Sequence, residues 1–314
     1  MRATWMVLLA VGCAANGGGS RDRDAGVVGD AGVSDVGVAT DANLSRPDVG
    51  PEADGGPGPS FCAAGAELVY VIDRNERLVR FDPRDLSFTD VGAIGCASSG
   101  TRPFSMSVDH DARAWVLFSD YQIRRVSTAD GSCEADALGL AAPFEQYGMG
   151  FTASGDDEVL YVSGGTFIDL LEGSPSRPAQ LGRHVPGTGA TTTIGPLANW
   201  PELSGNADGE LFAFYPPGPF DAPARIVELD PATATERRAF ELTDMVGDFD
   251  RSYAFAYWGG RLWVFIKPSA QTGSEVWRFD LPPEGDGSIT KVVDDARLTI
   301  VGAGVSICAP VDLI

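Results

Sequence analysis

The segment Leu262-Trp263-Val264-Phe265 decides the fold of this chain, because similar short apolar runs recur along the sequence. The other copies are Leu68-Val69-Tyr70-Val71, Ala114-Trp115-Val116-Leu117-Phe118, Leu160-Tyr161-Val162 and Leu211-Phe212-Ala213-Phe214. Successive copies begin 46 to 51 residues apart. Aromatic and β-branched residues bounded by Gly, Asp or Pro are typical of β-strands. The chain therefore contains a repeated β-rich unit.

Each apolar run has similar neighbours. A polar turn such as Asn206-Ala207-Asp208-Gly209-Glu210 precedes it, and a small-residue strand such as Phe104-Ser105-Met106-Ser107-Val108 precedes most of these turns. A third strand, such as Ile226-Val227-Glu228-Leu229, and then a looser fourth strand follow the run. Four antiparallel strands per repeat form the blade of a β-propeller. The repeat therefore predicts an all-β propeller domain over 61–314.

The two ends of the repeat region complement each other. The first repeat lacks its opening strand, whereas an unmatched small-residue strand, 302–307, follows the last repeat. Pairing this C-terminal strand with the first blade would close the ring and remove open sheet edges. We therefore expect five blades, or six if 164–200 contains an additional pair of strands. A two-sheet β-sandwich is the alternative, although sandwiches seldom have so regular a period.

The Leu-Trp/Tyr-Val strands and strand ends such as Phe81-Asp82-Pro83 resemble the propellers of the NHL, YWTD and streptogramin-lyase type. They are most similar to lipid-anchored propellers of bacteria with GC-rich genomes. The resemblance covers 61–314, and it implies a closed ring of blades.

The first 13 residues are typical of a bacterial export signal. Arg2 precedes an apolar run, 5–11, that is too short to span a bilayer. Ala10-Val11-Gly12-Cys13 resembles the lipobox of bacterial lipoproteins, which implies a signal peptide over 1–13 and lipidation of Cys13. An ordinary secretory signal is the alternative. Because Ala14 rather than Asp follows the cysteine, the sorting rule of that family favours the outer membrane.

Residues 14–60 have a different composition from the rest of the chain. They are rich in Gly, Ala, Asp, Val and Pro and contain no aromatic residue. Such a segment buries too little apolar surface to offset its ordering entropy, so we expect a disordered tether. The formal net charge of the chain, −21, argues against nucleic acid and against electrostatic docking on anionic lipid.

The cysteines agree with export. If Cys13 carries lipid, an even set of four remains, which indicates disulfides in an oxidising envelope. Three pairings are open to four cysteines. The repeat arrangement favours Cys62–Cys308, which would lock the ring, and Cys96–Cys133, which would join adjacent blades.

Catalytic motifs are weak in this sequence. His110 lies in an expected turn, and His184 lies in an expected strand near the surface. No Gly-x-Ser-x-Gly elbow and no P-loop occur. We therefore assign no catalytic residue.

Two groups of residues are candidates for binding. Asp244, Asp248 and Asp250 have spacings that a Ca²⁺ loop could use, but the terminal Glu of an EF-hand is missing. The aromatic candidates, in or next to long loops, are Trp200, Phe214, Tyr215 and Phe220. Aromatic side chains on loops of a rigid scaffold often anchor ligands. The alternative is that they cap the core of a large blade.

These patterns favour a monomeric, non-catalytic recognition module for an envelope protein, peptide or glycan. The alternatives are a propeller lyase or glycosidase acting on an envelope or extracellular polymer, and a structural spacer. An enzyme needs convergent titratable groups with shifted pKa values at one end of the central funnel. Clustering of Asp109, His110, Asp111 or Asp248 around the funnel mouth would favour the enzyme, and dispersal of these groups around the rim would favour the binding module.

Overall fold

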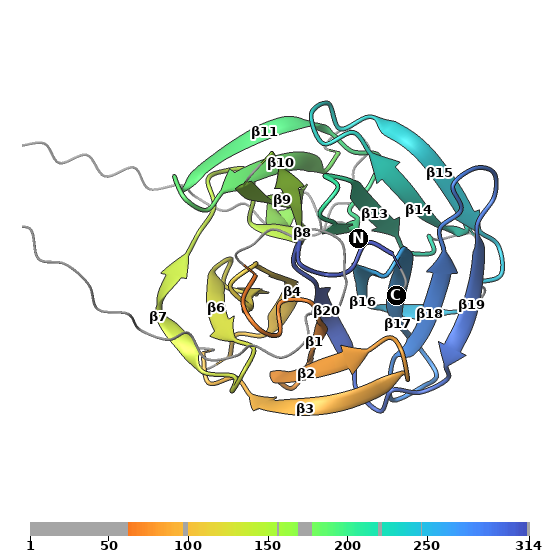
Figure 1. Ribbon diagram of the computed structural model, residues 1–314, viewed down its shortest axis with the longest axis horizontal. Helices are drawn as coiled ribbons and strands as arrows, with labels where there is room; N and C mark the ends of the chain where they lie inside the picture. Colours follow the sequence, from red (N-terminus) through yellow and green to blue (C-terminus); the bar gives the residue numbers. More distant parts are fainter. Residues whose placement is uncertain are drawn as a thin grey trace, which may run out of the picture. The chain divides into compact units, whose positions relative to one another are not determined.

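Twenty short strands form the repeated units. The computed structural model describes residues 62–96, 100–155, 157–168, 178–218, 222–245 and 247–312. Within this part of the chain, five antiparallel sheets of four strands surround a common axis (Figure 1). The prediction of an all-β, five-bladed propeller is confirmed, and the six-bladed alternative is wrong. The signal peptide, Cys13 and the tether lie outside the described residues.

In each blade, four strands follow one another from the axis outward. Blade 1 contains β20 (Ile300–Gly304), β1 (Val69–Asp73), β2 (Arg77–Asp82) and β3 (Ser87–Ala93). Blade 2 contains β4 (Pro103–Val108), β5 (Arg113–Phe118), β6 (Ile123–Ser127) and β7 (Cys133–Leu138). Blade 3 contains β8 (Gln146–Ser154), β9 (Asp157–Gly165), β10 (Gln180–Val185) and β11 (Ala190–Pro196). Blade 4 contains β12 (Glu202–Gly205), β13 (Leu211–Tyr215), β14 (Ala224–Leu229) and β15 (Glu236–Leu242). Blade 5 contains β16 (Phe249–Trp258), β17 (Arg261–Pro268), β18 (Glu275–Asp280) and β19 (Ser288–Val293).

Burial explains why the second strand of each blade gave the clearest sequence signal. Every residue of β1 and of β13 is buried, because both faces of such a strand pack against neighbouring blades. The outer strand β11 is mostly exposed and contains Thr residues. Aromatic pairs join the blades, as where the rings of Phe212 and Tyr257 stack with centroids 5.6 Å apart. Continuous apolar runs are therefore a consequence of two-sided burial.

The ring closes as expected from the two ends of the repeat region. Strand β20 pairs with β1 in antiparallel register, with Tyr70 opposite Gly304. Disulfides join Cys62 to Cys308 and Cys96 to Cys133, which are the two pairs that the repeat arrangement favours. Because disulfides persist in oxidising compartments, the two bonds indicate an extracytoplasmic protein. The described residues include no helix long and apolar enough to cross a membrane.

Neighbouring inner strands pack closely around the propeller axis. Gly150 of β8 faces Ser204 of β12, and a Cβ on Gly150 would lie 2.8 Å from the Cα of Ser204. Hydroxyl groups also join these strands: the Ser107 Oγ accepts a hydrogen bond from the backbone N of Phe151 at 3.1 Å. The Ser204 Oγ accepts one from the backbone N of Tyr257 at 2.8 Å. Small residues are thus required because the inner strands approach one another closely.

The ring has two different faces. Neighbouring inner strands run in parallel, as shown by contacts of Gly148 with Glu202 and of Gly150 with Ser204, so they all begin at one face. We call this the loop face; it carries the connections that enter each inner strand and those between the second and third strands, such as 119–122. We call the opposite side the turn face. It carries the short turns between the first and second strands, such as 109–112, and the entry of the chain at Cys62.

Candidate functional site

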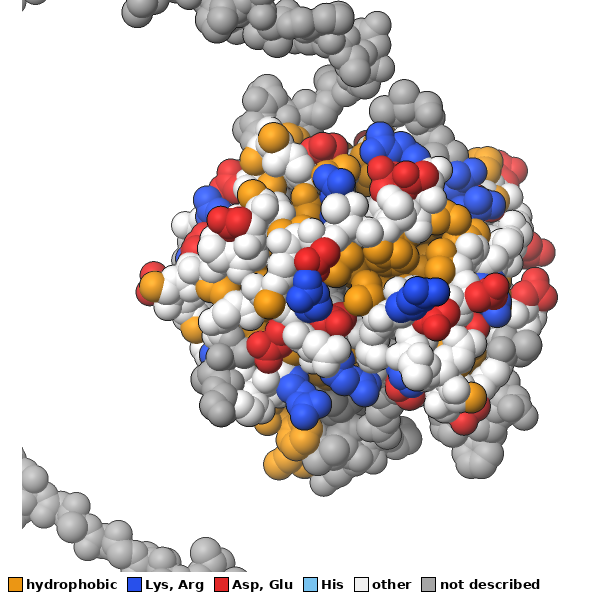
Figure 2. Space-filling view, turned by 90° about the horizontal axis from the view of Figure 1, so that it is seen from below, with side chains coloured by type: hydrophobic (Ala, Val, Ile, Leu, Met, Phe, Trp, Pro, Cys, Tyr) orange, Lys and Arg blue, Asp and Glu red, His pale blue; other side chains and the backbone are white. Residues whose placement is uncertain are grey.

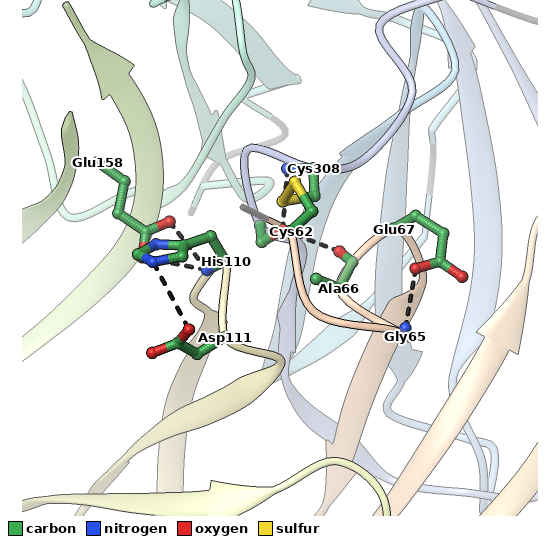
Figure 3. Close-up of a disulfide and its surroundings, with 9 residues drawn as sticks. Cys62, Gly65, Ala66, Glu67, His110, Asp111, Glu158 and Cys308 are labelled. Atoms are coloured by element: carbon green, nitrogen blue, oxygen red, sulfur yellow. Dashed lines mark hydrogen bonds and ion pairs between the residues drawn. A yellow bond between two sulfur atoms is a disulfide. The ribbon is translucent and has the colours of Figure 1, made fainter. Parts of the chain in front are cut away.

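An acid–histidine pair links two blades at the turn face. His110 lies in the turn between β4 and β5, and Glu158 lies near the beginning of β9 in the next blade. The His110 Nδ1 lies 2.6 Å from the Glu158 Oε1 (Figure 3). The backbone N of His110 also donates to both carboxylate oxygens, at 3.1 and 3.0 Å. The Glu158 side chain is 5% exposed and that of His110 is 31% exposed, so the carboxylate orients a partly accessible imidazole.

Burial changes the pKa of carboxyl groups at this turn. Burial raises the pKa of Glu158 to about 7, although hydrogen bonds and charge from His110 oppose the shift. Burial also raises the pKa of Asp109, whose Oδ2 accepts a hydrogen bond from the Trp115 Nε1 at 2.8 Å. The Asp111 Oδ1 lies 3.7 Å from the His110 Nε2. The Glu158 carboxyl group can therefore take up and release a proton near pH 7.

The same turn contacts the chain where it enters the propeller. The backbone N of Ala63 donates to the carbonyl O of His110 at 2.9 Å. The Ser306 Oγ donates to the carbonyl O of Ala66 at 2.8 Å, beside the Cys62–Cys308 disulfide (Figure 3). The acid–histidine pair is therefore continuous with the ring closure.

Two grooves lie on the turn side of the ring. The smaller has a volume of about 320 Å³ and lies beside Ala63, Arg113 and Thr128. The larger, of about 490 Å³, lies between blades 4 and 5. Its lining includes Glu210, Glu228, Arg238, Tyr257, Pro282 and Pro283. Neither groove is lined by His110 or Glu158.

A buried carboxyl group that the sequence reasoning missed lies in the axis. Glu202 begins β12, and its Oε2 accepts a hydrogen bond from the Ser105 Oγ of blade 2 at 2.9 Å. The backbone N of Met149 in blade 3 also bonds this carboxyl group. Burial raises the pKa of Glu202 to about 8, so the group is mainly neutral at pH 7. A single acid at a strand start gave no signal in the sequence, because its burial depends on three blades.

The expected Ca²⁺ residues do not converge. The Asp250 Oδ2 lies 3.0 Å from the Nζ of Lys267, and Asp250 also accepts a hydrogen bond from the backbone N of Ser252. Asp244 and Asp248 are exposed. The described residues contain no group of three His, Cys, Asp or Glu side chains placed to hold a metal ion. The Lys267 ammonium group therefore neutralises the Asp250 carboxylate, which was expected to bind Ca²⁺.

The aromatic candidates require a correction. Phe214 is 0% exposed and Tyr215 is 6% exposed; both lie in β13, whose side chains pack between blades. Trp200 is half-buried against the core of blades 3 and 4, and Phe220 lies outside the described residues. The core explanation therefore holds for Phe214 and Tyr215, because a second strand is covered on both faces.

His184 is also buried, contrary to its expected place near the surface. It is 1% exposed, and its Nδ1 lies 2.9 Å from the Thr191 Oγ1. Its ring centroid lies 6.1 Å from that of Trp115, which belongs to the adjacent blade. Burial lowers the pKa of His184, which is explained by the packing of β10 against blade 2.

Other apolar side chains are accessible on the loop face. Phe167 and Ile168 are 36% and 58% exposed, and they are the exposed large hydrophobic residues of the described chain. They follow β9, and the Phe167 ring centroid lies 6.4 Å from that of Tyr121 in blade 2. A Phe-Ile pair outside the repeated strands carried no periodic signal, which is why sequence reasoning did not select it.

The rim between blades 1 and 5 is apolar but framed by charge. Half-buried side chains that pack there include Leu86, Phe88, Val292 and Val293. Figure 2 shows this side of the ring, with a central hydrophobic patch among paired basic and acidic side chains. Arg77 of β2 bonds Asp90 of β3 in this way. Charge beside outer strands disfavours edge-to-edge association.

Comparisons with known proteins give similarity to solved structures only. No family model matches the chain, and no curated protein matches it. A putative gluconolactonase is 17% identical, covers 76% of this chain and 78% of its own, and has a TM-score of 0.42. A protein of unknown function from Bacteroides caccae is 9% identical, with coverages of 76% and 97% and a TM-score of 0.41. A chain of a mitotic checkpoint complex is 10% identical, with coverages of 88% and 93% and a TM-score of 0.40.

Proposed function

We propose that this protein is an exported, lipid-anchored propeller of the outer membrane that recognises an envelope protein, peptide or glycan without catalysis. The observation that supports it is that the candidate titratable groups do not all lie at one end of the ring. Asp109, His110 and Asp111 lie together at the turn face, whereas Asp248 directly precedes β16 at the loop face. An enzyme that uses the propeller funnel needs such groups to converge at one end of it.

The loop face is the proposed recognition surface. It carries the long connection that begins after β9, and loops on a rigid scaffold commonly carry binding residues. Phe167 and Ile168 expose apolar surface there, which is typical of interaction sites. The chain enters at the turn face, so a tether that holds the domain would leave the loop face accessible.

The experiment compares ligand binding by two variants of the full chain. The double variant Phe167→Ser and Ile168→Ser tests the loop face, and Ala129→Ser with Ala232→Ser in exposed turns is the control. The thermal unfolding midpoint of each variant is measured with and without added peptidoglycan fragments, envelope glycans or peptides. A ligand at a hundred times its dissociation constant stabilises the native state by about 2.7 kcal/mol. We expect the loop-face variant to lose this stabilisation and the control to retain it.

One observation favours the enzyme as a second candidate. Glu158 orients His110 at 2.6 Å, as a general acid–base pair requires. A lyase or glycosidase would lose turnover of its polymer in His110→Ala, whereas a recognition module would retain binding in that variant. If neither binding nor turnover is found with any probe, the spacer function replaces both.

The lipid anchor has a separate test. Cys13→Ser removes the residue that would carry lipid. We expect metabolic incorporation of labelled palmitate into the wild-type protein and its loss in the variant. Unchanged incorporation in Cys13→Ser would contradict the proposed anchor.

A further inference from the structure

We propose that His110 and Glu158 form a proton-dependent latch that fastens the entry of the chain and the first turn of blade 2 to blade 3. The latch is independent of the ligand that the loop face binds. It would make the turn face respond to the pH outside the cytoplasm.

The geometry places all parts of the latch in one continuous path. The entry segment bonds the turn through the Ala63 N and the His110 O, 2.9 Å apart. The turn bonds blade 3 through the backbone N and the Nδ1 of His110, which both contact the Glu158 carboxyl group. Glu158 belongs to the sheet of blade 3, where it pairs with Ala153 of β8. A single carboxyl group thus joins three segments that are distant in sequence.

The charged groups around Glu158 leave its ionisation dependent on His110. Asp109 and His110 of the turn between β4 and β5 act on Glu158 electrostatically; the acid disfavours its ionisation and the imidazole favours it. Arg113 contacts Asp111 at 2.9 Å and Glu134 at 3.4 Å, so its guanidinium is engaged by these carboxylates. Within blade 3, the neighbouring Asp157 is exposed to solvent.

The direction of the response follows from burial. The Glu158 side chain is 5% exposed, and burial disfavours a charged carboxylate. The protonated carboxyl group is therefore buried at a lower free-energy cost than the ionised one. Burial raises the pKa of Glu158 to about 7 in the closed latch, and the group returns to its ordinary range when solvent reaches it. Proton binding therefore favours the closed latch, and this contribution is lost progressively as pH rises from the ordinary range of a Glu pKa to about 7.

Hydrogen exchange of the full chain tests the latch. Protection factors, corrected for the intrinsic exchange rate, are measured between pH 5 and 8.5 for peptides that contain Ala63 and His110. We expect protection to fall by up to about tenfold per pH unit between pH 5 and 7 and to level off above that pH. Glu158→Gln, which cannot ionise, should remove this dependence. The control is Glu210→Gln in the corresponding turn of blade 4, where Glu210 bonds the amide of Asn206 at 2.7 Å; it should keep the wild-type dependence.

A second measurement uses the wild-type chain and does not depend on a variant that folds. The chain has two histidines, so selective isotope labelling separates the backbone amide signals of His110 and His184 by NMR. We expect the His110 amide, which donates to the Glu158 carboxyl group, to report a transition near pH 7 that the His184 amide does not share. A His110 amide without a transition between pH 6 and 8, or protection in Glu158→Gln that still depends on pH, would overturn the latch.

Discussion

The two faces of this propeller are built from the same blades but are stabilised in different ways. The turn face combines short connections with the ring-closing disulfide and the His110–Glu158 pair. The loop face carries longer connections and exposes Phe167 and Ile168. Hairpin geometry and ring closure constrain the first face, whereas the loops of the second can change without disturbing the sheets. Under the proposed function, recognition and ring closure would lie on opposite sides of one ring.

The largest expected effect is on ring closure at the turn face. Cys62 and Cys308 are 246 residues apart in sequence, whereas Cys96 and Cys133 are 37 residues apart. In the chain-entropy treatment, the longer loop stabilises the native state by about 5 kcal/mol and the shorter one by about 4 kcal/mol. We expect the Cys62→Ser and Cys308→Ser double variant to lose more stability in denaturant unfolding than Cys96→Ser with Cys133→Ser. Equal or reversed losses would contradict the greater role of the ring-closing bond.

The next effect concerns the axis near the loop face. The pKa of Glu202 is raised by burial to about 8, so the folded state binds a proton that the unfolded state releases near pH 4.5. Stability from this group is present at low pH and is lost as pH rises towards 8. We expect a decrease of about 3 kcal/mol between pH 5 and 8. Unfolding of Glu202→Gln across this range should lack that slope, and a slope identical to wild type would show that other groups cause it.

A smaller effect should separate the packed axis from the rim. A Cβ at Gly150 would lie 2.8 Å from the Cα of Ser204, where backbone cannot easily move, whereas a Cβ at Gly187 meets nothing within 4 Å. Overpacking of this kind costs about 2 kcal/mol. We therefore expect Gly150→Ala to lower the free energy of unfolding by about that amount. Gly187→Ala is the control and should leave stability nearly unchanged, whereas similar losses in both variants would contradict close packing at the axis.

The smallest effect is expected at an ion pair of the loop face. The Lys267 side chain is 12% exposed beside Asp250, whereas Lys291 is 35% exposed beside Glu275. Burial alone would raise the pKa of Asp250, but hydrogen bonds from Lys267 and Ser252 lower it overall. This stabilisation is present above the ordinary Asp pKa and is lost in acid. Chemical unfolding at pH 7 should show that Lys267→Met loses about 1 kcal/mol and Lys291→Met loses less; the reverse order would contradict this ranking.

Much of the fold could be predicted from the sequence because burial on both faces of the second strands leaves a periodic apolar pattern. The unmatched strand 302–307 and the position of Cys62 also indicated how the ring closes. The candidate site was harder to predict from the sequence. His110 was visible only as a polar residue in a turn, and nothing near it in sequence indicated Glu158, which is 48 residues away.

The sequence by itself determined the regular repeat of apolar strands and the way in which the ring closes, and it favoured the pairing of Cys62 with Cys308. These features follow from local composition repeated at a regular interval. Only the tertiary structure decided which polar and aromatic side chains are buried. Phe214 and Tyr215 are core residues. Asp250 pairs with Lys267, and the carboxyl group of Glu202 accepts a hydrogen bond from Ser105 of another blade. Contacts between blades set the burial and charge of these groups, and those contacts join residues that no short stretch of sequence brings together.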